Sequence, residues 1–130
     1  MGQPNFLIDT NAVIDYLGGK LPPERMTFMN DVVNAVPNVS VITKIEVLGY
    51  NTEPEAYQLL TDFMQASVVL NLNEAIVNRT IALRKEYKIK IADSIIAATA
   101  LVNELVLISR NTADFKKIVG LQVFNPHGET

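Results

Sequence analysis

The stretch FLIDTNAVIDYL, residues 6–17, decides how the fold begins. Its first three residues are apolar and lead directly into an acid, Asp9, as at the end of a short buried strand. Apolar residues then recur at helical spacing as far as Leu17, and the pair Gly18 and Gly19 ends that segment. A short strand that passes at once into a helix is typical of an α/β fold.

The rest of the chain repeats this alternation of short apolar runs and amphipathic segments. Further strands are predicted at 39–42, 67–72, 105–109 and 121–124. Helical spacing predicts helices at 23–36, 43–50, 54–64, 74–87 and 92–103, and a helical turn that opens at Asn111. Short apolar strands that alternate with helices indicate a parallel sheet covered on both faces.

The composition predicts a soluble protein. The chain has 130 residues, 48% of them apolar, and no cysteine, which excludes disulfides and thiolate metal sites. The longest apolar run, 95–102, is far shorter than the roughly 20 residues of a membrane span. No basic leader precedes an apolar segment near the N-terminus. We therefore expect a single domain over residues 1–130, located in the cytoplasm and without a membrane partner.

Charge is distributed unevenly along the chain. The net charge is −3, with nine acids and three bases in residues 1–78 but eight bases and five acids in residues 79–130. Solvated helix faces explain most of the bases individually, whereas the group as a whole could form a strip that faces a nucleic acid. The residues that we predict to bind the backbone of a nucleic acid, RNA or DNA, are Lys44, Arg84, Lys85, Lys88, Lys90, Arg110 and Lys116.

Four acids follow the predicted strands. Asp9 ends the first strand, Glu46 lies one helical turn after the second, Asp93 begins the most apolar helix, and Asp114 lies one turn after the strand at 105–109. Because the carboxyl ends of parallel strands meet at one edge of a sheet, all four could converge there. Hard oxygen ligands without histidine or cysteine suit Mg²⁺ or Mn²⁺, and a cation would offset the repulsion among the carboxylates.

Each acid also has a structural explanation. Thr43 and Glu46 have the spacing of a helix capping box, and Asn111 and Asp114 have a similar arrangement with aspartate as the returning group. Asp93 in a first helical turn complements a helix dipole, and Asp9 could cap the helix that follows it. The consistent placement of four acids after strands favours a shared site over four separate structural roles. Asp15 differs from them, because its position in the middle of a helix favours a solvated or salt-bridged surface acid.

Other chemistries lack the residues that they need. His127 is the only histidine and lies in a polar, tail-like end, which excludes a histidine-based triad. No serine stands in a nucleophile elbow, and no glycine-rich loop is present to bind phosphate. A receiver-like phosphotransfer domain would need a lysine at a late strand end, where this chain has Ser109 and Arg110. A non-catalytic module that binds protein or RNA is the alternative to an enzyme.

Four segments together resemble, in order and spacing, the signature segments of PIN-domain nucleases, and most closely those of the VapC toxins of prokaryotic toxin–antitoxin pairs. They are LIDTNAVIDYL (7–17), VITKIEVLGY (41–50), IADSIIAATA (91–100) and LISRNTADF (107–115). The resemblance extends from residue 6 to residue 126. It implies a three-layer α/β/α sandwich around a parallel sheet of four to five short strands.

The resemblance also implies an endoribonuclease that depends on Mg²⁺ or Mn²⁺. Matched by position, the catalytic and metal-binding acids are Asp9, Glu46, Asp93 and Asp114, and the supporting polar residues are Thr10, Asn11, Ser109 and Asn111. Some branches of the superfamily carry an acid at the position of Asn111, so the fourth carboxylate here has to come from Asp114. This departure leaves open whether one metal or two are bound.

The same resemblance implies three partners. They are an RNA substrate, a small VapB-like antitoxin whose tail covers the acidic groove, and a second copy of the chain in a homodimer. Residues 22–36 and 54–65 are expected to supply apolar surface for a partner. A catalytically degenerate PIN fold kept for binding remains the alternative interpretation.

Overall fold

The structure, a computed structural model, describes residues 5–128. The strands are β1 (Phe6–Ile8), β2 (Asn38–Ser40), β3 (Val68–Leu70), β4 (Val106–Ile108) and β5 (Val123–Phe124). The helices are α1 (Thr10–Leu17), α2 (Pro23–Asn34), α3 (Val41–Leu48), α4 (Pro54–Gln65), α5 (Glu74–Glu86), α6 (Ile91–Val102) and α7 (Thr112–Phe115). No helix within the described range is long and apolar enough to cross a membrane.

The five strands form one parallel sheet in the order β3-β2-β1-β4-β5. The first strand lies at the centre, where Leu7 pairs with Asn38 of β2 on one side and with Leu107 of β4 on the other. This arrangement confirms the predicted parallel sheet. It also brings the carboxyl ends of β1, β2 and β4 side by side, because neighbouring parallel strands end at the same edge.

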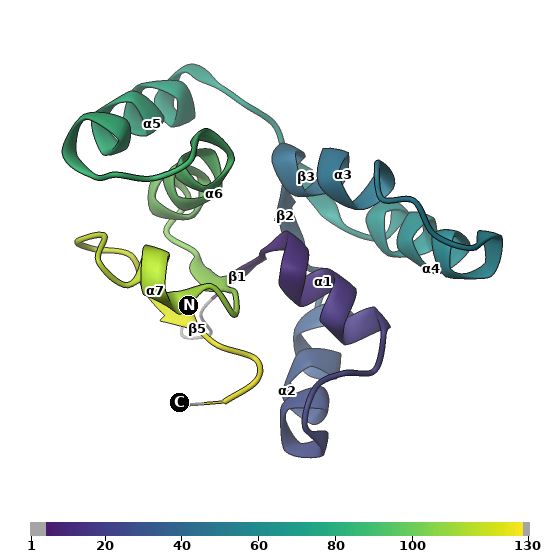
Figure 1. Cartoon of the computed structure of the whole chain (residues 1–130). Helices are drawn as coiled ribbons and strands as arrows, with labels where there is room; N and C mark the ends of the chain where they lie inside the picture. The colour runs from purple at the N-terminus through teal and green to yellow at the C-terminus, as the bar shows by residue number, and fades with distance from the viewer. Residues whose placement is uncertain (1–4, 129–130) are drawn as a thin grey trace.

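Helices cover both faces of the sheet (Figure 1). Ile8 and Ile108 belong to a core that contains buried residues of α1, α2, α3 and α4, whereas Leu7 and Leu107 belong to a second core built with α5, α6 and α7. The alternation follows from the period of two in a strand, which sends successive side chains to opposite faces. The predicted three-layer α/β/α sandwich is therefore confirmed.

The second strand is shorter than predicted, and the helix after it begins earlier. Helix α3 begins at Val41, and the hydroxyl of Ser40 caps it by accepting from the backbone N–H of Ile42 over 3.0 Å. The predicted capping box is therefore wrong, since Thr43 lies inside the helix and is fully buried. As a result, the carboxylate of Glu46 has no role in capping and is available to the edge of the sheet.

The C-terminal segment folds back onto the body of the protein. The Phe124 ring packs against Phe28 with 4.7 Å between centroids, and Phe28 in turn meets Phe6 edge-on. After this anchor, the backbone N–H of His127 donates to the side-chain oxygen of Asn125 over 2.9 Å, which tightens the turn. The prediction of a tail-like end around His127 is wrong, because this side chain returns to helix α1.

Candidate active site

An open cleft of about 560 Å³ lies at the carboxyl ends of β1, β2 and β4. Three of the four predicted acids line it, together with three of the predicted supporting residues. Its lining consists of Asp9, Thr10, Asn11, Ile14, Glu46, Gly49, Tyr50, Asn51, Asp93, Arg110 and Asn111. The strand-end rule of open α/β sheets thus places the polar residues together where the sequence predicted them.

Asp9 is the most deeply enclosed acid of the cleft, with 4% of the residue exposed. The backbone N–H of Asp9 continues the β1–β4 pairing by donating to the carbonyl of Ile108. This hydrogen bond holds the backbone from which the Asp9 side chain extends. One carboxylate oxygen caps α1 by accepting from the N–H of Thr10 over 2.8 Å. The other oxygen accepts from the hydroxyl of Ser109 at 2.8 Å and from the amide of Asn11 at 3.1 Å. The predicted capping role of Asp9 is confirmed, and it is compatible with a role in the cleft.

Burial raises the pKa of Asp9 above its ordinary value, and the negative charges of Asp93 and Glu46 raise it further, although its hydrogen-bond donors oppose the change. The pKa of Asp93 is also raised, first by burial and then by the charges of Asp114 and Glu46, while Lys90 acts in the opposite direction. The ionised forms of Asp9 and Asp93 are therefore costly, and the charges of Glu46 and Asp114 contribute to that cost. A cation among them would be strongly favoured.

Thr10 and Thr43 position the carboxylate of Glu46. The hydroxyl of Thr10 donates to a carboxylate oxygen of Glu46 and lies 3.2 Å from the hydroxyl oxygen of the buried Thr43. Thr10 was predicted to belong to the site, whereas Thr43 was not. The spacing of Thr43 and Glu46 was the available signal, because residues three apart lie on the same face of a helix.

The segment that follows β4 holds the remaining polar residues in place. The hydroxyl of Ser109 accepts from the N–H of Asn111 at 3.0 Å while it donates to Asp9. The side chain of Asn111 donates to Asp114 over 3.3 Å. Asp114 does not line the cleft, unlike the other three acids, and its influence on Asp93 is that of a nearby charge.

The chemistry of this donor set fits Mg²⁺ or Mn²⁺, although the acids are not drawn tightly together. Within residues 5–128, no three side chains of histidine, cysteine, aspartate or glutamate are grouped closely enough to hold an ion by themselves. Mg²⁺ commonly binds through only one or two carboxylates, with water or substrate oxygens at its other positions. Asp9, Glu46 and Asp93 supply carboxylate oxygens of this kind on one wall of an open, water-accessible space.

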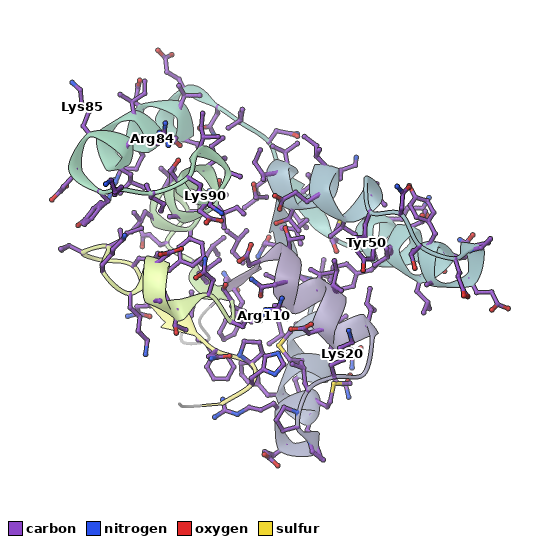
Figure 2. The ribbon with its side chains drawn as sticks, in the orientation of Figure 1. Lys20, Tyr50, Arg84, Lys85, Lys90 and Arg110 are labelled. Atoms are coloured by element: carbon purple, nitrogen blue, oxygen red, sulfur yellow. The ribbon has the colours of Figure 1, made fainter. Side chains whose placement is uncertain are left out.

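Two of the seven predicted RNA-binding bases lie at the acids. Arg110 lines the cleft, and the charge of Lys90 acts on Asp93 from the residue that precedes α6. Lys85 projects outward from the far part of α5, whereas Arg110 and Lys90 lie nearer the centre of the molecule (Figure 2).

The other predicted bases are occupied or lie elsewhere. The guanidinium of Arg84 donates to the carbonyl of Ile89 over 2.6 Å. Lys88 is exposed and absent from the lining of the cleft, and only its backbone carbonyl has a side-chain contact, with the ammonium of Lys117. The two others, both exposed and absent from the lining of the cleft, are Lys44 on α3 and Lys116 directly after α7.

Asp15 is not the surface acid that the sequence indicated. Only 3% of the residue is exposed. One of its carboxylate oxygens contacts Nη1 of Arg110 at 2.9 Å and Nε2 of His127 at 2.8 Å. The expectation of an ion pair is confirmed, while the expectation of a surface position is wrong.

Comparisons with known proteins agree with this geometry. The family model of the PIN domain matches residues 6–121. A chain of a toxin–antitoxin complex from Klebsiella pneumoniae is 34% identical, with a TM-score of 0.74 over 94% of this chain and 98% of that one. A chain of VapBC-1 from nontypeable Haemophilus influenzae is 25% identical, with a TM-score of 0.73 over 95% of this chain and 98% of that one.

DNA-bound VapBC from Salmonella typhimurium contains a chain with the same fold, at 24% identity and a TM-score of 0.78, over 95% of this chain and 99% of that one. No curated protein matches the sequence. The family match covers most of the chain, and the resemblance to VapC-like toxins that the four sequence segments indicated is confirmed. The chain belongs to the PIN-domain family.

Proposed function

We propose that the chain is an endoribonuclease that depends on Mg²⁺ or Mn²⁺ and acts as the toxin of a toxin–antitoxin pair. PIN-domain proteins are generally nucleases, and the family match covers residues 6–121. The observation that carries the proposal is the meeting of Asp9, Glu46 and Asp93 in one open cleft. Burial and neighbouring negative charges raise the pKa values of Asp9 and Asp93, so their ionised forms are costly for the fold unless a bound cation offsets the repulsion.

Asp9 and Asp93 would be the primary ligands of the ion, and Glu46 and Asp114 would complete its shell or orient a water molecule. When bound, such an ion lowers the pKa of water and stabilises the charge that develops on a phosphodiester during cleavage. The surrounding residues keep the ligands in place, since Ser109 donates to Asp9 and Thr10 donates to Glu46. Donors of this kind orient ligands and maintain their charged form.

An RNA substrate would need cations beside these acids, because its phosphates and the carboxylates repel each other. Arg110, which lines the cleft, and Lys90, whose charge acts on Asp93 from the residue before α6, would contact the backbone near the acids. The excess of bases over acids in residues 79–130 would also attract the phosphates of RNA. We assign to Arg110 and Lys90 the binding of substrate phosphates.

An antitoxin partner is part of the proposal, since the Klebsiella pneumoniae and Haemophilus influenzae relatives come from toxin–antitoxin complexes. A smaller apolar groove, of about 150 Å³, adjoins the acid cleft and shares Ile14 and Tyr50 with it. Leu59 of α4 lies along this groove and is 53% exposed. A partner segment with an apolar part and a basic part would fit the two spaces together.

A homodimer is proposed as well, and the exposed Val77 and Ile81, one turn apart on α5, provide apolar surface for it. Light scattering on the purified chain will report its mass in solution. A mass equal to that of one chain at all concentrations would contradict the dimer.

The enzymatic proposal is tested by incubating the purified chain with total RNA and with DNA, each in Mg²⁺, in Mn²⁺ and in EDTA. We expect discrete RNA fragments in either metal and none in EDTA. Intact RNA under all conditions, or cleavage that persists in EDTA, would contradict the proposal. Cleavage of DNA instead of RNA would retain the metal chemistry but refute the substrate.

A further inference from the structure

A buried acid outside the proposed metal site joins the cleft to the C-terminal segment. Asp15 on α1 places a single oxygen, Oδ2, within hydrogen-bond distance of Arg110 and of His127. These partners lie 95 and 112 residues away in sequence. An ionised carboxylate only accepts hydrogen bonds, so a hydrogen bond from Nε2 of His127 to ionised Asp15 requires the tautomer that carries a proton on Nε2.

The position of each partner is fixed independently of the ion pair. The backbone N–H of Arg110 donates to the side-chain oxygen of Asn11 over 3.1 Å, and His127 is held by the turn at Asn125. A buried carboxylate is costly unless it is paired and hydrogen-bonded, so the contacts to Asp15 have to be retained for the acid to be tolerated. The guanidinium of Arg110 is therefore held at one end, while its side chain is 55% exposed toward the cleft.

The contact between Asp15 and Arg110 matters because of the groups that Arg110 would otherwise contact. Arg110 is the one base among the described residues that line the cleft, and it shares that lining with three carboxylates. A free guanidinium beside Glu46 and Asp93 would pair with them, since Arg matches carboxylates in a bidentate geometry. Such pairing would fill the place of a metal ion and would remove the cation that a phosphate needs.

We propose that Asp15, supported by His127, is a positioning residue that holds Arg110 at the rim of the cleft. There the guanidinium is kept away from the metal-binding carboxylates and presents its free N–H groups to a phosphate of the substrate strand. Only one nitrogen of the guanidinium contacts Asp15, which leaves donors for a second anion. The inference rests on the proposed function, because it assumes that the cleft takes a metal ion and a phosphodiester.

Four proteins test the proposal: the wild type, Asp15→Asn, Arg110→Gln and the double variant. Binding of a fluorescent single-stranded RNA oligonucleotide is measured by anisotropy in EDTA over a range of salt concentrations, so that no cleavage occurs. Mn²⁺ binding is measured separately by calorimetry without RNA. Thermal unfolding of each protein identifies variants that fail to fold, and the double variant, which removes the buried carboxylate together with its cation, remains informative if a single variant does not fold.

In the RNA experiment, each single variant should bind about tenfold more weakly, as expected for loss of one charge-assisted hydrogen bond to phosphate. The slope of log affinity against log salt should fall by about 0.7. The double variant should bind no more weakly than either single variant, because both changes remove the same contact. Wild-type RNA affinity in Asp15→Asn, or losses that simply add in the double variant, would overturn the proposal.

In the Mn²⁺ experiment, Asp15→Asn should bind the ion about fivefold more weakly, since the released Arg110 competes for the carboxylates with the strength of an exposed ion pair. Arg110→Gln should not lose Mn²⁺ affinity, and the double variant should recover it. If the role of Asp15 is purely structural, the double variant will not recover Mn²⁺ affinity. That result would refute the proposal that Asp15 positions Arg110. The wild type and the variants could show the expected RNA and Mn²⁺ binding while the wild type does not cleave RNA. That result would refute the proposed function but would still support the positioning role of Asp15.

Discussion

Without divalent ions, the Asp93→Asn variant should be more stable than the wild type. With divalent ions, the variant should be less stable than the wild type. Burial and the charges of Asp114 and Glu46 raise the pKa of Asp93, and they outweigh the opposing charge of Lys90. The charged form of Asp93 is thus a net cost to the metal-free fold. Asparagine removes that cost with little change of shape.

Removing such a charge should raise the free energy of unfolding of the metal-free protein by about 1 kcal/mol. For a chain of 130 residues this corresponds to a rise in Tm of about 4 °C. Mn²⁺ at a hundred times its Kd should stabilise the wild type by about 2.7 kcal/mol. If Asp93 is a ligand, its asparagine variant gains little of that free energy, so the order of the two melting temperatures reverses.

The dependence on pH has a defined sign. Because the folded-state pKa of Asp93 lies above its ordinary value of 3.8, the folded chain binds more protons than the unfolded chain between the two values. Wild-type stability relative to the variant therefore falls as the pH rises through that window and stays constant above it. The advantage of Asp93→Asn in EDTA should shrink as the pH is lowered toward 3.8.

Thermal unfolding followed by circular dichroism, in EDTA and in Mn²⁺, measures these differences. Asp31→Asn serves as the matched control, since Asp31 is an exposed acid of α2 away from the cleft and should leave both melting temperatures unchanged. An Asp93→Asn protein that is less stable than the wild type in EDTA would refute the electrostatic reasoning. An equal gain from Mn²⁺ in both proteins would remove Asp93 from the ligand set.

Three further changes have distinct expected outcomes. Ser109→Ala removes a hydroxyl that donates to Asp9 at 2.8 Å, and should weaken Mn²⁺ binding about tenfold in calorimetry; unchanged affinity would show that this donor does not support the site. Asp114→Asn should weaken Mn²⁺ binding less than Glu46→Gln does, because Asp114 lies outside the lining of the cleft, and the reverse order would make it a primary ligand. Leu59→Glu should weaken binding to the cognate antitoxin in surface plasmon resonance without altering RNA cleavage, and undiminished binding would exclude the apolar groove as its docking site.

The fold was predictable from the sequence because its signals are local. Strands β1 and β4 are short apolar runs that are each followed by a polar residue, since Ile8 precedes Asp9 and Ile108 precedes Ser109. The parallel sheet then brings these strand ends to one edge without any knowledge of side-chain contacts. For the same reason, the positions of Asp9, Glu46 and Asp93 after their strands were enough to predict that these acids meet.

What the sequence could not predict depends on competition between local signals or on distant contacts. Val41 and Ile42 are β-branched and extend the apparent strand, but Ser40 ends it by capping α3. The burial of Asp15 requires His127 to return to α1 across 112 residues, and no spacing along the chain indicates this contact. Side-chain pairs of this kind follow from the packing of the C-terminal segment as a whole.

The most direct test of the account is the rate at which the protein cleaves a defined RNA in saturating Mg²⁺, measured for the wild type, Asp9→Asn, Asp93→Asn and the control Asp31→Asn. If the cleft is a metal-dependent nuclease site, both cleft variants should lose at least about 2.7 kcal/mol of transition-state stabilisation, a hundredfold or more in rate. The control should cleave at the wild-type rate. Undiminished cleavage by either Asp9→Asn or Asp93→Asn would contradict the account.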